Sequence, residues 1–331
     1  MDTIKNVSSP EISKQWVSGE DLLKRASSEV PKLWEPYLPK TGLVAITGPS
    51  DCGKSSFARQ LALSIVTGRN RFLGNKLNST TQKVHLVCTE DSAEAIGSHL
   101  KTMKQARGIT DPLDRLGFLF NFNSLYDELD RRLTVVPADL LVMDAWVDGF
   151  DGNINSPVDV RRDLEKYRRL AEKHNCLILI VHHNTKNSEK FSPDKNRVNG
   201  SQAIEAKMRC VMDLRKGTTD SERYLSITKC NYLPESAKKD SLVLQYQDSE
   251  RTFVYAGKKL DKSAIAESIQ IKKYDPSVWI PEMMRIKEPE KLSFEAAREK
   301  LLTLHANKEV PGVTWFKENY KGFNIPSDIK N

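Results

Sequence analysis

A glycine loop that ends in lysine and serine is the strongest chemical signal in this sequence. Residues 48–55 read GPSDCGKS and fit the pattern G-x-x-x-x-G-K-[ST] at every fixed position. Backbone N–H groups of such a loop bind a phosphate chain, and the N-terminus of the following helix adds about half a positive charge. We expect Lys54 to reach the β- and γ-phosphates of a nucleotide and the Ser55 hydroxyl to ligate Mg²⁺. The predicted nucleotide contacts are Gly48, Pro49, Ser50, Asp51, Cys52, Gly53, Lys54, Ser55 and Ser56.

The residues on both sides of this loop support the same interpretation. Residues 42–47 (GLVAIT) are apolar and partly β-branched, which predicts a short buried strand. Residues 55–66 place apolar side chains at helical spacing, which predicts a helix directly after the loop. Strand, glycine loop and helix in this order are the context that the motif requires. A chance match on a glycine turn is the alternative, and the correct flanks argue against it.

Hydrolysis of a bound nucleotide also requires a second anchor for magnesium. Asp144 follows four apolar residues in the strand predicted at 138–144. At the end of that strand its carboxylate is expected beside the glycine loop, where it would hold Mg²⁺ through water. The alternative interpretation is an ordinary aspartate that begins a turn.

A further carboxylate is needed to polarise the attacking water. Glu90 follows the strand predicted at 83–88 and is our candidate. Its neighbour Asp91 fits the spacing almost as well. Both could instead cap the helix that begins near Ala93, because aspartate and serine are common at helix N-termini. We assign Asp91 or Ser92 to the cap and Glu90 to catalysis.

Two adjacent histidines, His182 and His183, follow the apolar strand predicted at 176–181. A polar side chain at this strand end can touch the γ-phosphate and report its loss to the chain that follows. Zinc binding is a weaker alternative, because neighbouring side chains on a strand point apart and one metal ion would rarely take both. Simple capping of the strand end is the third interpretation.

A long polar loop is predicted over 184–200, and loops of this length in compact domains are usually functional. It is rich in cations that could grip a nucleic-acid backbone. The candidate nucleic-acid contacts are Lys186, Lys190, Lys195 and Arg197. Phe191 could stack on a base, but no other aromatic residue accompanies it. A solvated surface loop is the alternative.

Three further cations follow this loop. Lys207 and Arg209 are expected on a helix over 201–210, and Lys229 on a later strand. Any of them could reach the nucleotide of a neighbouring subunit, and such arginine fingers accelerate hydrolysis by roughly 10³–10⁵. Ordinary surface charge is an equally good interpretation for each one alone.

The composition of the chain is that of a globular protein. Apolar residues make up 39 % and charged residues 29 % of the 331 residues, and no run approaches the roughly 18 apolar residues of a membrane span. The N-terminus lacks the apolar core of a signal peptide, and five scattered cysteines form no C-x-x-C pair. We therefore expect reduced thiols, a cytoplasmic location and no membrane partner. A net charge of +7 is compatible with binding to nucleic acid.

Predicted strands and helices alternate from 42 to about 183, which indicates an α/β fold with a mostly parallel sheet covered by helices. Three later runs, 223–229, 241–246 and 251–255, predict an antiparallel meander. We divide the chain into an N-terminal lead segment (1–40, with a helix over 17–33), a core (41–258) and a charged, helix-prone extension (259–331). The helix predicted over 294–304, with the 311–316 segment after it, could form a winged-helix-like unit or a docking helix.

Taken in order, these motifs resemble those of RecA-fold ATPases in the hexameric replicative helicase group, especially its RepA-like branch with AAA-25-type domains. The resemblance covers about residues 20–256. It is carried by residues 48–55, 89–91, 141–144, 180–183, 199–203, 207–209 and 228–232. It implies a RecA-like P-loop ATPase core whose twisted, mostly parallel sheet is flanked by helices and continued by antiparallel strands.

The resemblance also implies a six-membered ring of identical subunits that binds ATP and Mg²⁺ between subunits and threads single-stranded DNA through its centre. Carried over by position, the functional residues are Lys54 and Ser55 at phosphate and Mg²⁺, Glu90 at the water, Asp144 at Mg²⁺, His183 or His182 at the γ-phosphate, and Arg209, assisted by Lys229, as the cations from the next subunit. Two features depart from the pattern. Asp51 and Cys52 replace the usual small loop residues, and the C-terminal extension is additional.

These observations predict a DNA-dependent helicase or translocase that acts in replication of a plasmid, phage or mobile element. A second hypothesis is an ATP-gated assembly or loading factor that oligomerises and recruits a replication or mobile-element partner through residues 259–331. A weaker third hypothesis is a recombinase filament of the RecA or RadA type, for which we identify no N-terminal polymerisation motif.

Overall fold

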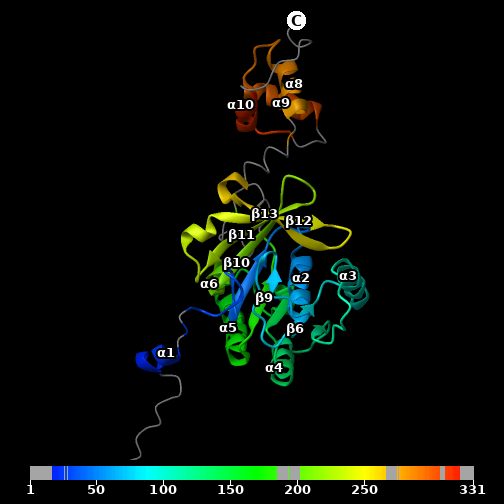
Figure 1. Cartoon of the computed structure of the whole chain (residues 1–331). Helices are drawn as coiled ribbons and strands as arrows, with labels where there is room; N and C mark the ends of the chain where they lie inside the picture. Colours follow the sequence, from blue (N-terminus) through cyan, green and yellow to red (C-terminus); the bar gives the residue numbers. More distant parts are fainter. Residues whose placement is uncertain are drawn as a thin grey trace, which may run out of the picture.

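The computed structural model describes residues 17–184, 202–265 and 276–320, apart from 26, 28 and 306–309, together with residues 193 and 274. A nine-stranded sheet forms its centre (Figure 1). Six strands are parallel, in the order β10 (Cys210–Lys216), β3 (Gly42–Thr47), β9 (Leu177–Val181), β8 (Leu140–Asp144), β6 (Val84–Cys88) and β7 (Leu116–Leu119). Antiparallel strands continue from β10, in the order β11 (Glu222–Cys230), β12 (Asp240–Gln247) and β13 (Thr252–Asp261).

Helices bury both faces of the parallel part. Alternate residues of β3 point to opposite faces, so that Val44 and Ile46 join one hydrophobic cluster while Leu43 and Ala45 join another. The first cluster includes side chains of α2 (Lys54–Val66) and α3 (Ala93–Ala106). The second includes side chains of α4 (Leu125–Val135), α5 (Pro157–His174) and α6 (Gln202–Lys207). Burial on both faces explains the continuous apolar runs in the sequence, and the predicted fold class is confirmed.

Local signals set the helix boundaries. The Ser92 side chain accepts a hydrogen bond from the N–H of Ala95 at 3.3 Å, so serine and not Asp91 caps α3. Ser156 accepts from the N–H of Asp159 in the same way at the start of α5, where proline occupies the first turn. These caps fix where each helix leaves the end of its strand.

The strand β10 was not expected from the sequence. The helix predicted over 201–210 is shorter, and β10 begins at Cys210, pairing with β3 on one side and β11 on the other. Asp213 and Arg215 interrupt its apolar pattern, although both are buried. Nε of Arg215 donates a hydrogen bond to the Asp213 carboxylate at 2.7 Å. Because the two charges pair with each other, this charged segment can lie in the interior of the sheet.

The two ends of the core also differ from the prediction. Within the described part of the lead segment, which begins at residue 17, the one helix is α1 (Gly19–Arg25), and β1 (Lys32–Trp34) and β2 (Leu38–Pro39) follow it. Trp34 is fully buried and its indole N–H donates to the Phe72 carbonyl at 2.9 Å, so the end of the segment assigned to 1–40 belongs to the core. A short hairpin, β4 (Arg71–Phe72) and β5 (Asn75–Lys76), completes this region.

The boundary expected near 258 falls inside β13, which continues to Asp261. Beyond it, α8 (Pro276–Lys287), α9 (Phe294–Leu304) and α10 (Val313–Tyr320) pack around a hydrophobic cluster of their own (Figure 1). Two short 3₁₀ segments, η1 (Trp146–Gly149) and η4 (Glu235–Lys238), lie in connections. All five cysteines are buried and free. No helix in the described ranges has the length and apolar character needed to span a bilayer.

Candidate nucleotide-binding site

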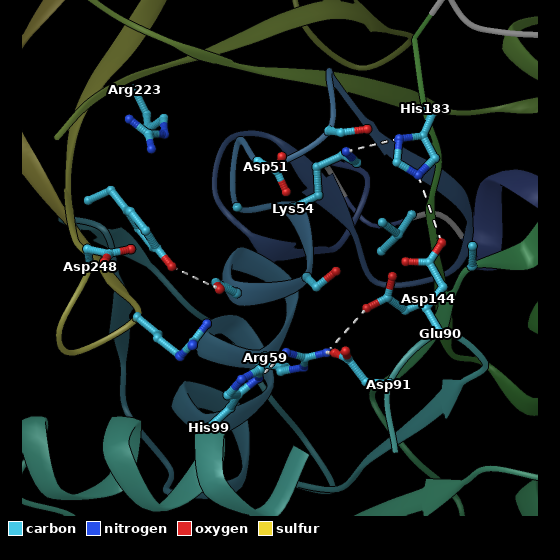
Figure 2. A pocket seen from close by; sticks show the side chains of 18 of the residues that line it. Asp51, Lys54, Arg59, Glu90, Asp91, His99, Asp144, His183, Arg223 and Asp248 are labelled. Carbon is cyan, nitrogen blue, oxygen red and sulfur yellow. Dashed lines mark hydrogen bonds and ion pairs between the residues drawn. The ribbon is translucent and has the colours of Figure 1, made fainter. Parts of the chain in front are cut away.

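A cavity of about 720 Å³ lies at the carboxyl ends of the parallel strands. Parallel strands end at one edge of the sheet, so residues that follow different strands converge there. The glycine loop follows β3, Glu90 follows β6, Asp144 ends β8 and His183 follows β9. All four motifs line this cavity (Figure 2). The structure therefore brings together residues that the sequence analysis grouped by chemistry alone.

The glycines of the loop are required by its shape. Gly48 has φ of 154°, and a Cβ there would lie 2.2 Å from the backbone oxygen of Leu214 on β10. Gly53 has φ of 98°, and its Cβ would lie 2.7 Å from the Phe253 ring. Both contacts are shorter than packed atoms allow, and both φ values disfavour side chains. Asp51 adopts φ of 57°, a region that aspartate tolerates better than most residues.

Lys54 directs its ammonium group back toward the loop. Its Nζ donates to the carbonyls of Gly48 at 3.2 Å and Pro49 at 2.7 Å, and it lies 3.5 Å from Nδ1 of His183. The residue is 6 % exposed. A nearly buried cation beside an anion-binding loop, with its donors directed to neutral carbonyls, is suited to exchanging them for phosphate oxygens.

Ser55 and Asp144 lie together in the cavity and are its candidate metal ligands. Asp144 is 6 % exposed and accepts a hydrogen bond from Ser55. Burial raises the pKa of this carboxyl, while the Ser55 hydrogen bond and the positive charge of Arg59, 3.8 Å away, oppose the rise. A serine hydroxyl and a carboxylate in contact supply two oxygen ligands, and hard oxygen donors fit Mg²⁺.

The two neighbouring carboxylates after β6 have different surroundings. Asp91 accepts a hydrogen bond from Nη2 of Arg59 at 2.6 Å, while Nη1 of the same guanidinium donates to His99 at 3.1 Å. The Glu90 side chain is 54 % exposed, and its Oε1 lies 3.9 Å from Nε2 of His183 (Figure 2). Glu90 is therefore the carboxylate that remains available to a reacting water.

The two histidines are separated by burial. His182 is buried and packs its ring edge-on against Trp146, with centroids 6.2 Å apart. His183 is 40 % exposed and lies between Lys54 and Glu90 (Figure 2). The zinc alternative gains no support, since the described residues contain no cluster of three or more His, Cys, Asp or Glu side chains placed to hold a metal ion.

The antiparallel strands add cavity residues that the sequence analysis missed. Arg223 on β11 donates from Nε to the Cys52 carbonyl at 3.1 Å, and its guanidinium lies 5.2 Å from the Tyr246 ring centre. The Tyr246 hydroxyl lies 3.3 Å from Oγ of Ser56. The cavity also takes His99, Lys216, Asp248 and Arg251. For Arg59, the one local signal was an arginine within the apolar pattern of α2.

The sequence around Arg223 and Tyr246 gave no signal that they belong to the site, because the pairing of β11 and β12 with distant strands places them at the cavity.

The cations predicted to reach the nucleotide of a neighbouring subunit lie at the opposite edge of the sheet, where the parallel strands begin. Arg209 directly precedes β10, and its Cγ lies beside Gly42 at the start of β3. Lys229 donates to the Glu205 carbonyl at 2.7 Å, and Lys207 pairs with Glu165 at 2.8 Å. The Arg209 side chain is exposed and forms no hydrogen bond or ion pair with any residue that the structure describes. A six-residue strand separates its ends by roughly 20 Å, so Arg209 cannot reach the cavity of its own chain.

The predicted nucleic-acid contacts Lys186, Lys190, Lys195 and Arg197 lie outside the described residues, as does most of the segment 199–203. The structure therefore leaves their predicted role as it stood.

Three comparisons relate this chain to known proteins. A family model described as AAA domain, of the AAA-25 type, matches residues 9–189, more than half of the chain. The crystal structure of the RadB recombinase is similar at 17 % identity, with a TM-score of 0.46, over 65 % of this chain and 90 % of that chain. No curated protein matches the sequence. The matched residues include the glycine loop, Glu90, Asp144 and His183.

We expect Gly48→Ala to weaken nucleotide binding at least about tenfold, because the added Cβ would overlap a backbone oxygen that cannot rotate away. Gly97→Ala is the matched control. Gly97 lies within α3 with nothing within 4 Å of its Cβ position, so alanine should stabilise the protein by about 0.5–1 kcal/mol and leave binding unchanged. Titration with a fluorescent ATP analogue and thermal unfolding measure both effects. Equal affinities for the two variants would contradict this account of the loop.

Proposed function

The chain belongs to the AAA domain family, and we propose that this RecA-like P-loop ATPase is an ATP hydrolase that forms a ring and works as a DNA-dependent translocase or helicase. One observation carries the hydrolase part of the proposal. Lys54, His183 and Glu90 form a row across the cavity, beside the contacting pair Ser55 and Asp144. Phosphate binding, metal binding and water activation are therefore served from one edge of the sheet.

The glycine loop and Lys54 would hold the triphosphate of ATP. Ser55 and Asp144 would hold Mg²⁺, which when bound neutralises charge on the phosphate oxygens. The fit is supported by the shape of the loop, which requires glycine at positions 48 and 53, and by the hydrogen bond between Ser55 and Asp144. Arg59 offers its positive charge to Asp144 and Asp91, which limits repulsion among the carboxylates of the cavity.

Glu90 is the general base in this proposal, and His183 links it to Lys54. An ammonium group only donates hydrogen bonds, so Nδ1 of His183 accepts from Lys54 and the ring proton lies on Nε2, toward Glu90. His183 can thus respond to the position of Lys54 on one side and orient the Glu90 carboxylate on the other. This arrangement supports a role for His183 in sensing the γ-phosphate.

The proposed assembly is supported by the position of Arg209. An exposed cation at one edge of the sheet and a cavity at the other suit a head-to-tail contact, in which each subunit supplies Arg209 to its neighbour's nucleotide. Such contacts close into rings when the rotation allows it. The ionic contact between Lys229 and Glu205 supports a secondary role for Lys229, in orienting the α6 segment that precedes Arg209.

DNA is the proposed track because of the net charge of +7 and the cations of the 184–200 segment. The alternative, an ATP-gated loading factor, is favoured by one observation. The helices α8, α9 and α10 bury Trp279, Trp315 and Phe316 in a separate cluster, as an independent recruiting module would. In that case the same ATP site would gate assembly without strand separation.

We expect Glu90→Gln to lower kcat by about 10²–10³ while ATP still binds, because an amide cannot accept the proton of the attacking water. Asp91→Asn is the matched control, one residue away. Its carboxylate is already bound to Arg59, so we expect lower stability and a much smaller loss of kcat. Steady-state phosphate release and analogue binding measure both quantities. A larger loss of kcat in Asp91→Asn would transfer the catalytic role to Asp91.

Mixing two inactive variants tests the head-to-tail contact. Lys54→Ala lacks a working loop, and Arg209→Ala lacks the cation offered to the neighbour. We expect an equimolar mixture to recover about one quarter of wild-type turnover, because one seam in four then combines an intact loop with an intact arginine. Mixing Lys54→Ala with Glu90→Gln is the control and should stay inactive, since both changes affect the same half of the site. Absence of recovery in the first mixture would argue against Arg209 as the trans cation.

Single-stranded DNA should stimulate ATP turnover severalfold, with an effect that falls as salt rises, because phosphate contacts release counterions. Strand displacement with the wild type and with Lys54→Ala as the inactive control then separates a motor from a loading factor. ATP turnover that ignores DNA, together with ATP-driven assembly, would favour the loading factor.

A further inference from the structure

We propose that Asn184, anchored by the buried pair Asp213 and Arg215, is a positioning residue that ties the glycine loop to His183. The inference rests on the proposed ATP hydrolysis and concerns how its parts are kept in register. Asn184 directly follows His183 and is the last described residue of its segment. None of these three residues was assigned a role by the sequence motifs.

The backbone of Asn184 holds the loop. Its N–H donates to the Gly48 carbonyl at 3.2 Å, and the same carbonyl accepts from Nζ of Lys54 at 3.2 Å. A carbonyl oxygen has two acceptor positions, so both donors can be satisfied together. Gly48 is therefore the joint at which the strand end carrying His183 meets the lysine that would bind phosphate.

The side chain of Asn184 is held from the other side. Its Nδ2 donates to Oδ1 of Asp213 at 2.8 Å. The other carboxylate oxygen, Oδ2, accepts from Nε of Arg215 at 2.7 Å and lies 2.7 Å from Nη2. Asp213 and Arg215 are each 1 % exposed. The two oxygens of one buried carboxylate are thus divided between a fixed cation and Asn184.

The strand that carries this pair also abuts the loop. Asp213 pairs with Thr47, the last residue before the loop, and the Leu214 oxygen is the atom that a Cβ on Gly48 would strike. For stability alone, a buried ion pair is no better than apolar residues of similar volume, because both charges must be desolvated. In this pair, one oxygen of Asp213 binds Asn184 instead of Arg215. The pair therefore fixes the position of the chain that follows β9, beside His183.

This anchoring has a consequence when phosphate binds. Phosphate oxygens would compete for Lys54, and the Gly48 carbonyl would then keep Asn184 as its remaining donor. A buried carbonyl left without a donor destabilises the protein, so this hydrogen bond contributes more in the bound state than in the free state. Asn184 therefore holds His183 in place while Lys54 changes partners, and its side chain should matter for turnover more than for binding.

The central experiment compares Asn184→Ala with the full-length wild type. We expect kcat to fall about tenfold or more, because an error of about 1 Å in a catalytic group can cost up to 10². KM and the affinity for an ATP analogue should stay within about twofold, since the backbone N–H remains. Asn78→Ala is the matched control. Its amide also donates two hydrogen bonds, to the Lys32 carbonyl and to Glu35, but it lies outside the cavity, so it should leave kcat unchanged.

Asp213→Asn supplies the conservative variant. Its amide oxygen can still accept from Asn184, whereas Arg215 loses its counter-charge. We therefore expect Asp213→Asn to unfold at a lower temperature than Asn184→Ala but to have a higher kcat than Asn184→Ala. If the role were purely structural, the less stable variant would have the lower kcat. A kcat at the wild-type level in Asn184→Ala, or a parallel loss of kcat and affinity, would overturn the proposal.

A readout without turnover separates this inference from the proposed function. ¹⁵N signals of the His183 ring, assigned with His183→Gln, report its tautomer. The wild type should carry the proton on Nε2, and Asn184→Ala should show exchange between tautomers. If the wild type releases no more phosphate than Lys54→Ala, the proposed hydrolysis is wrong. The ¹⁵N signals still report whether Asn184 holds the His183 ring in one tautomer. Identical signals in wild type and Asn184→Ala would then reject the anchoring role.

Discussion

The glycine loop depends on donors for its carbonyl groups, and these donors come from three parts of the fold. Lys54 on α2 binds the carbonyls of Gly48 and Pro49, the Asn184 N–H after β9 binds Gly48 again, and Arg223 on β11 binds Cys52. Buried carbonyls without partners are costly, so these contacts hold the loop in one shape. The parallel sheet alone would present a glycine loop, but the antiparallel strands are needed to fix it.

The sequence analysis succeeded where the signal is local. The loop pattern occupies eight consecutive residues, and its flanking strand and helix are recognisable because a strand buried on both faces is apolar without interruption. Asp144 and Glu90 could be placed because the carboxyl ends of parallel strands converge at one edge. Once the alternation of strands and helices is recognised, the edge that carries the site follows without knowledge of the strand order.

The failures share a physical cause, which is that partners distant in sequence decide burial. The strand β10 was missed because Asp213 and Arg215 interrupt its apolar pattern. Two charged residues predict an exposed segment unless it is known that they pair with each other. Trp34 read as part of a polar lead, although its indole N–H finds Phe72 in the core. The choice between His182 and His183 depends on which face of β9 meets Trp146, and residue spacing leaves that open. Tertiary contacts decide the burial of each of these residues.

The charge distribution of the cavity bears on how the proposed assembly would work. The cavity is lined by the carboxylates of Asp51, Glu90, Asp91, Asp144 and Asp248 and by the cationic side chains of Lys54, Arg59, Lys216, Arg223 and Arg251. Arg59 is already committed to Asp91 and lies near Asp144, so Lys54 is the cation of α2 that is left for phosphate. A further cation placed at the charge that develops on the γ-phosphate accelerates hydrolysis by roughly 10³–10⁵ in P-loop enzymes. In the proposed head-to-tail assembly, a second copy of the chain would bring Arg209 from the far edge of its own sheet to that phosphate.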